Sequence, residues 1–108
     1  MGQHDADSFV RLYMEPGMQH CDNGPGPDSF GQVGRLTFDD PRHSVNAALI
    51  DWVEKRTAPA TIIATKYAEG DHHATMTRPL CVYPQSAKYR GKGDTNDAAS
   101  FMCEAGKK

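Results

Sequence analysis

The sequence predicts a small α/β domain, and three observations predict it. Residues 45–53 carry apolar side chains at the helical period, whereas residues 61–65 and several later segments are β-branched or extended. Ten glycines and seven prolines lie among the 108 residues, which exceeds the average usage of about 12%. Much of the chain is therefore loop, and the core of such a short chain is expected to be thin.

The N-terminal third predicts one strand and one long loop. Residues 9–14 form a short, mostly apolar run that is typical of a buried strand. Residues 15–35 begin with EPGMQHCDNGPGPDSF, in which proline and glycine recur at close intervals, so they predict a turn-rich loop. This loop presents His20 and Cys21 next to each other.

The clearest element is a helix after the irregular segment around Pro41. Ser44 is its expected N-cap, Lys55 and Arg56 suit the negative end of the helix dipole, and Pro59 prevents continuation. An apolar stripe predicts that the helix packs against a core, and its members are Val45, Ala48, Leu49, Trp52 and Val53.

The C-terminal half predicts short strands. Residues 61–65 are β-branched, and residues 74–77 are their expected hairpin partner. Residues 78–84 are extended between two prolines, and residues 87–90 are a candidate last strand before the flexible segment GKGDTND. Together these segments predict a short β-hairpin tail after the helix.

Charge and hydropathy exclude two classes of partner. The net charge is −2, with 12 basic and 14 acidic residues spread along the chain, so no basic stripe is available to bind nucleic acid. No apolar run reaches the roughly 20 residues that cross a bilayer, and the polar N-terminus, MGQHDADS, lacks the pattern of a signal peptide. We therefore expect neither a nucleic-acid nor a membrane partner.

The three cysteines are an odd number, so in an oxidised protein one thiol is unpaired, bonded elsewhere or reactive. Cys81 and Cys103 are 22 positions apart, on either side of a glycine-rich stretch. Closing a loop of that length stabilises a fold by roughly 3 kcal/mol. Cys21 is the remaining thiol, and the lack of Cys-x-x-Cys spacing argues against a zinc site.

His20 has two interpretations. It is either a loop histidine that hydrogen-bonds to a backbone carbonyl, or a general base, because imidazole chemistry on a constrained loop suits proton transfer. A base needs a nucleophile, and no Gly-x-Ser-x-Gly string occurs in this chain. Ser29 comes closest, but Pro27 replaces the first glycine.

The other histidines and the acidic residues near the loop are not expected to bind metal. His72 and His73 lie in a polar turn beside Asp71, and adjacent side chains on a strand point to opposite faces. We expect structural or solvated side chains here and at His4 and His43. The same holds for four aspartates that lack EF-hand spacing, Asp22, Asp28, Asp39 and Asp40.

Three strings in order carry a family resemblance. YMEPGMQHCDNGPGPDSF, ALIDWVEKRTAPATIIATKY and TRPLCVYPQSAKYRGKGDTNDAASFMC resemble the C-terminal end of the tannase and feruloyl esterase family. The resemblance covers most of the chain, from about Phe9 to Cys103. It implies an α/β-hydrolase fold with a Ser-His-Asp triad that hydrolyses esters of phenolic acids such as gallate or ferulate.

The resemblance also implies a role for individual residues. His20 matches the catalytic histidine on the loop after the last core strand. Cys21 matches a cysteine that forms a disulfide with the residue next to the nucleophilic serine, outside this chain. Cys81 and Cys103 match a second, C-terminal disulfide. Residues 1–108 would be one partial domain with the last core strand, the histidine loop, the amphipathic helix and the hairpin tail.

Other parts of the family pattern lie upstream of this chain. They are the serine, its neighbouring cysteine, the triad aspartate, and a lid with a Ca²⁺ site and much of the substrate pocket. Glu15 and Gln19 stand where an apolar and a small residue are expected, and Met1 resembles an internal methionine.

We therefore expect the C-terminal part of a secreted or periplasmic ester hydrolase, inactive alone. Its partners would be the missing N-terminal part and a phenolic ester. The alternative is a small, non-enzymatic binding or metal-binding module that uses the histidines and Cys21.

Overall fold

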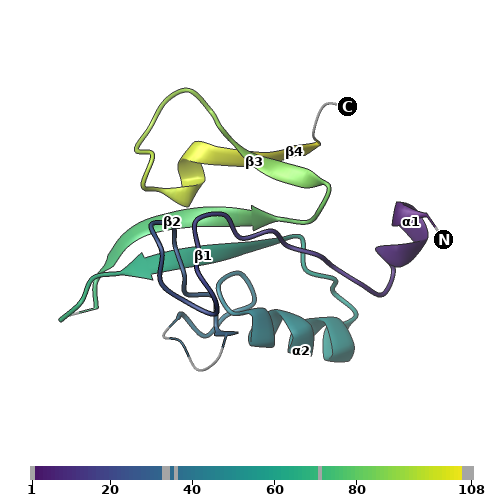
Figure 1. Cartoon of the computed structure of the whole chain (residues 1–108). Helices are drawn as coiled ribbons and strands as arrows, with labels where there is room; N and C mark the ends of the chain where they lie inside the picture. Colours follow the sequence, from purple (N-terminus) through teal and green to yellow (C-terminus); the bar gives the residue numbers. More distant parts are fainter. Residues whose placement is uncertain (1, 33–34, 36, 71, 106–108) are drawn as a thin grey trace.

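Two antiparallel strand pairs and one long helix make up the fold (Figure 1). The computed structural model describes residues 2–32, 35, 37–70 and 72–105. Helix α2 lies on one side of the pair β1–β2, and the pair β3–β4 lies on the other. The elements are α1 (Gln3–Ala6), α2 (Val45–Lys55), β1 (Thr61–Tyr67), β2 (Ala74–Cys81), β3 (Gln85–Tyr89), the 3₁₀ turn η2 (Ala98–Ser100) and β4 (Phe101–Ala105).

Helix α2 confirms the predicted helix and its ends. The hydroxyl of Ser44 accepts a hydrogen bond from the Ala47 N–H at 3.2 Å, as an N-cap does. Arg56 ends the helix in the left-handed conformation, with φ of 56°. Part of the predicted stripe is not buried, because Leu49 and Val53 are 57% and 73% exposed. None of the helices in the part of the chain described here could span a membrane.

The core lies between α2 and one face of the pair β1–β2. Ile62 and Ala64 on β1 and Leu80 on β2 share this face because side chains two residues apart point the same way. They contact Ala48 of α2, and the partly buried rings of Tyr13 and Phe30 pack against the cluster. Four small or medium side chains make a thin core, as the composition predicts.

Strand β2 confirms the predicted hairpin partner at residues 74–77, and it continues across Pro79 to Cys81 as one strand instead of two segments. Pro79 stands opposite Ile63 of β1. The Ile63 N–H donates to the carbonyl oxygen of Arg42 at 2.6 Å, away from β2. Ile63 and Pro79 therefore form a non-hydrogen-bonded pair. Because no backbone hydrogen bond between β1 and β2 is made at this position, the proline's missing N–H does not interrupt the pairing.

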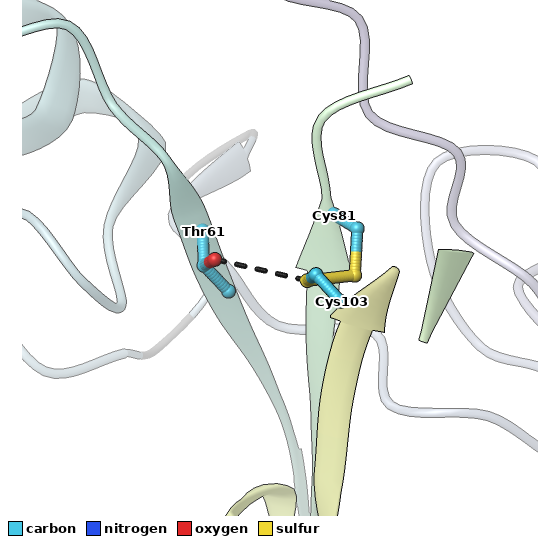
Figure 2. Close-up of a disulfide and its surroundings, with 3 residues drawn as sticks. All are labelled: Thr61, Cys81 and Cys103. Carbon is cyan, nitrogen blue, oxygen red and sulfur yellow. Dashed lines mark hydrogen bonds between the residues drawn. A yellow bond between two sulfur atoms is a disulfide. The ribbon is translucent and has the colours of Figure 1, made fainter. Parts of the chain in front are cut away.

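Strand β4 is an element that the sequence patterns did not predict. It pairs with β3, with Ala87 opposite Cys103, and β3 itself begins two residues before the predicted strand. A disulfide joins Cys103 of β4 to Cys81 of β2, with the two Cα atoms 5.7 Å apart. Figure 2 shows this bond, with the hydroxyl of Thr61 on β1 3.8 Å from the Cys103 sulfur. The disulfide therefore holds the two strand pairs together.

The predicted buried strand at residues 9–14 is wrong for this structure. In the described part of the chain, one isolated bridge joins Tyr13 to Val82, supported by a hydrogen bond of 2.8 Å from the Tyr83 N–H to the Leu12 carbonyl oxygen. A strand needs a longer ladder with a neighbour, and this segment has none here. Its apolar side chains are about half exposed or more, namely Phe9, Val10, Leu12 and Met14.

Candidate functional site

The histidine loop, residues 17–26, is closed by a narrow neck. The Gly26 N–H donates to the Gly17 carbonyl oxygen at 2.8 Å, and within the loop the Gln19 N–H donates to the Asn23 carbonyl oxygen at 3.1 Å. A Cβ atom at Gly24 would overlap the Gly17 carbonyl oxygen. The loop closes because these glycines let two backbone segments approach each other.

His20 and Cys21 are both exposed near the tip of this loop. The Cys21 sulfur lies 3.0 Å from Nδ1 of His20. Cys21 has a φ of 70°, an unusual value for a residue with a side chain. Because the sulfur faces Nδ1, the other ring nitrogen, Nε2, is available to an outside partner.

Three side chains from outside the loop hold the backbone that follows His20. Nε2 of Gln32 donates to the Cys21 carbonyl oxygen at 3.2 Å. The Asn23 N–H donates to the carboxylate of Asp28 at 2.8 Å. Nζ of Lys66, on strand β1, donates to the Gly24 carbonyl oxygen at 2.7 Å. The loop is therefore tied to the sheet.

Asp28 is the most deeply buried of these supports. The residue is 2% exposed, and its carboxylate pairs with Nη2 of Arg35 at 2.9 Å. The same guanidinium reaches Asp22 with Nη1, at 3.5 Å. A buried carboxylate is costly without a partner, and Arg35 supplies one here.

Glu15, just before the loop, is a second buried acid, and it lacks such a partner. Neither carboxylate oxygen is accessible, and neither has a hydrogen bond among the described residues. Burial, and then the nearby charge of Asp28, raise the pKa of Glu15 to about 8. An acid therefore occupies the place where the family resemblance implies an apolar side chain.

An imidazole–carboxylate pair lies just before helix α2. Nδ1 of His43 is 2.9 Å from Oδ1 of Asp40, and this hydrogen bond lowers the pKa of Asp40. The Asp40 carboxylate also accepts hydrogen bonds from the backbone N–H groups of Arg42 and His43, and the Phe38 ring lies 5.0 Å from the imidazole. These contacts order the turn before Ser44, which agrees with the structural interpretation of His43.

Ser29 has a structural place, whereas His72 and His73 lie on the surface. Ser29 is 1% exposed and exchanges backbone hydrogen bonds with Thr65 of β1, at 2.9 Å in each direction, so it is no nucleophile here. His72 and His73 are exposed, and Asp71, named with them above, lies outside the described residues. Among the residues that the structure describes, no three His, Cys, Asp or Glu side chains are placed to share a metal ion.

The sequence analysis did not single out Arg35, Gln32 or Lys66. Their contacts join residues up to 42 positions apart, and no local spacing rule connects such pairs. The buried position of Asp28 has a weak local signal, because an aspartate within a proline-glycine loop commonly bonds nearby backbone groups.

Comparisons with known proteins match this chain to a part of larger esterases. The family model described as "Tannase and feruloyl esterase" matches residues 1–104. An uncharacterized esterase of Xanthomonas campestris pv. campestris is 46% identical over 100 residues, which cover 88% of this chain and 17% of that protein. The mono(2-hydroxyethyl) terephthalate hydrolase of Piscinibacter sakaiensis is 42% identical over 101 residues, which cover 93% of this chain and 15% of that protein.

The fold is also found within larger solved structures. An esterase from Aspergillus oryzae matches with a TM-score of 0.88 at 32% identity, over 96% of this chain and 21% of that one. Feruloyl esterase B from the same organism matches with a TM-score of 0.84 at 30% identity, over 96% of this chain and 20% of that one. The chain thus spans about a fifth or less of the length of these relatives.

Proposed function

The chain belongs to the tannase and feruloyl esterase family, and from that membership we propose that it is the C-terminal part of a carboxylic ester hydrolase with an α/β-hydrolase fold. Residues 1–108 are one partial domain of that fold. Two of its relatives are named for feruloyl and terephthalate esters, in which the ester bond belongs to an aromatic acid. We propose the same class of substrate, esters of phenolic or related aromatic acids, for the complete enzyme.

His20 is the general base in this proposal. The observation that carries it is an exposed imidazole on a loop whose backbone is tied to the sheet, with Nε2 available. His20 takes the proton from a serine hydroxyl as the serine attacks the ester carbonyl. It then gives that proton to the leaving alcohol. The serine and the aspartate that orients the imidazole come from upstream sequence.

Cys21 bonds to a cysteine beside that serine in the same proposal. Its thiol is free and exposed, which a bond to a residue outside the chain requires. A disulfide holds two Cα atoms about 5.5–6 Å apart, so the residues next to them come within hydrogen-bonding reach. The bond would therefore hold the base beside its nucleophile.

The complete enzyme is proposed to be secreted or periplasmic. The disulfide between Cys81 and Cys103 supports this, because disulfides persist in oxidising compartments. The family resemblance implies that the calcium ion is bound by the lid, upstream of this chain. No step of the proposed reaction assigned to this chain involves a metal.

The experiment compares the chain alone with the chain joined to the upstream part of its Xanthomonas relative. We expect no turnover of methyl ferulate or methyl gallate by the chain alone and measurable turnover by the joined protein. His20→Ala should then lower kcat by about 10³-fold or more. His43→Ala removes an imidazole already paired with Asp40 and is the matched control. Full activity of the His20→Ala protein would refute the assignment.

A further inference from the structure

His20 is placed by the backbone of its loop. His20 is exposed, and its ring contacts Cys21, the next residue. Cys21 and Asn23 have φ values of 70° and 64°. Such values are uncommon for residues with side chains, and more so for cysteine than for asparagine. Contacts from outside the turn therefore help to fix the conformation at Cys21.

We propose that Asp28 is a positioning residue for His20. This inference rests on the proposed function, in which His20 is the base. The side chain of Asp28 is 3% exposed, and its carboxylate accepts the Asn23 N–H at 2.8 Å. Asp28 acts on the imidazole through this backbone amide and does not contact the ester.

Arg35 completes the arrangement. Its guanidinium binds the Asp28 carboxylate with Nη2 at 2.9 Å and reaches the Asp22 carboxylate with Nη1 at 3.5 Å. Asp22 directly follows Cys21, and Asn23 directly follows Asp22. The ion pair of buried Asp28 with partly exposed Arg35 therefore contacts two successive residues of the turn that sets the direction of His20.

The other supports of the loop differ from Asp28 in kind. Gln32 and Lys66 are half-buried side chains that donate to carbonyl oxygens, at 3.2 Å and 2.7 Å. Water can replace such donors. Asp28 is the acceptor for a turn N–H and is shielded from water, so its removal leaves that N–H without an equivalent partner.

The first test is NMR on the 108-residue chain. Asp28→Ala removes the acceptor and the charge, whereas Asp28→Asn keeps an acceptor of the same shape without the charge. Asp94→Ala is the matched control, because the Asp94 carboxylate also accepts a backbone N–H, from Asn96 at 2.8 Å, in the loop between β3 and η2. We expect Asp28→Ala to increase the exchange rate of the Asn23 amide about tenfold or more and to shift the ring signals of His20. The effect of Asp28→Asn should be smaller.

Signals of helix α2 and of His43 should stay unchanged in the Asp28 variants, and Asp94→Ala should leave His20 unchanged. The proposal is overturned if the folded Asp28→Ala chain keeps the wild-type signals of His20 and Asn23. If that variant does not fold, the proposal is tested by the His20 and Asn23 signals of the Asp28→Asn chain compared with those of the wild-type chain. An Asn23 amide that exchanges in the wild-type chain as fast as an exposed amide also overturns it.

The second test uses the joined hydrolase. A displaced base slows the chemical step more than it weakens substrate binding, so Asp28→Asn should lower kcat about 10- to 100-fold and leave KM within about twofold. A loss confined to KM contradicts a positioning role. If the joined protein shows no turnover with wild-type Asp28, the proposed function fails, while the NMR result still decides whether Asp28 holds the turn.

Discussion

The sulfur of Cys21 lies 3.0 Å from Nδ1 of His20. In a Ser-His-Asp triad this is the ring nitrogen that the carboxylate binds, while Nε2 faces the serine. In this structure the free thiol lies beside the ring nitrogen that the triad carboxylate would bind if His20 is the base, as proposed. Bonding of Cys21 to a second cysteine removes its S–H donor and leaves Nδ1 to the aspartate, which is consistent with the proposed disulfide.

Cys21 should react as the single free thiol. The unreduced chain is expected to take up one equivalent of iodoacetamide, at Cys21, because Cys81 and Cys103 are bonded to each other. Mass spectrometry of peptides locates the label. After reduction and unfolding, three labels are expected. The Cys21→Ser chain should take up none before reduction, and a label at Cys81 or Cys103 in the unreduced wild-type chain contradicts the pairing.

Loss of the disulfide should weaken the whole fold. Replacing Cys81 and Cys103 by serine should lower the free energy of unfolding by about 3 kcal/mol, because the bond closes a loop with a separation of 22 residues. Urea denaturation followed by circular dichroism measures the change. Cys21→Ser is the control for removing a thiol that is not bonded, and it should alter stability little. Equal stability with and without the bond would contradict its role in joining β2 to β4.

Gly24→Ala should open the neck of the histidine loop. Gly24 has a φ of 99°, and an added Cβ would overlap the Gly17 carbonyl oxygen. Gly91 has a similar φ of 93°, but an added Cβ meets no atom within 4 Å. Both alanines carry the backbone strain, about 1–2 kcal/mol, so Gly91→Ala isolates it.

The Gly24→Ala chain should therefore be the less stable of the two, by urea denaturation, and only it should shift the amide signals of residues 17–26. If both variants lose the same stability and the amide signals of residues 17–26 do not shift, the close approach of Gly24 to Gly17 does not determine the conformation of the loop.

Glu15 should make stability fall as the pH rises. Its carboxyl loses its proton near pH 4.5 in the unfolded chain but near pH 8 in the folded one, because burial raises its pKa. Below pH 4.5 the acid is protonated in both states and ionisation costs nothing. Between these two pH values Glu15 ionises in the unfolded state but stays protonated in the folded state. The free energy of unfolding therefore falls as the pH rises, until the pKa of the folded state is reached.

Thermal melts of the wild-type and Glu15→Gln chains between pH 4 and 9 measure this effect. The two melting temperatures should be similar near pH 4, and the variant should be more stable by about 4 °C or more near pH 8. Glu69→Gln, at an exposed position, controls for the loss of one carboxylate. A constant difference across this pH range contradicts the buried, unpaired state of Glu15.

Patterns between near neighbours in the chain predicted part of this structure well. Ser44 caps α2 because its hydroxyl bonds an N–H three residues away, and Ala48 of the predicted stripe faces the core, whereas Leu49 and Val53 do not. Strand β1 follows from its β-branched residues. The same reasoning failed at residues 9–14. An apolar run shows which side chains are favourable to bury, but not whether another segment of the chain packs against them. This reasoning also failed at Pro79, whose place depends on which way the opposite N–H points.

The sequence by itself determined the helix and its ends, the turn-rich loop with adjacent His20 and Cys21, and the family, through strings of residues in a fixed order. These depend on backbone preferences and on contacts within a few residues. Only the tertiary structure decided that Asp28 binds Asn23 and Arg35, that Lys66 reaches Gly24, and that β4 pairs with β3. Folding brings distant segments to hydrogen-bonding distance, and no spacing in the sequence records which donor meets which acceptor.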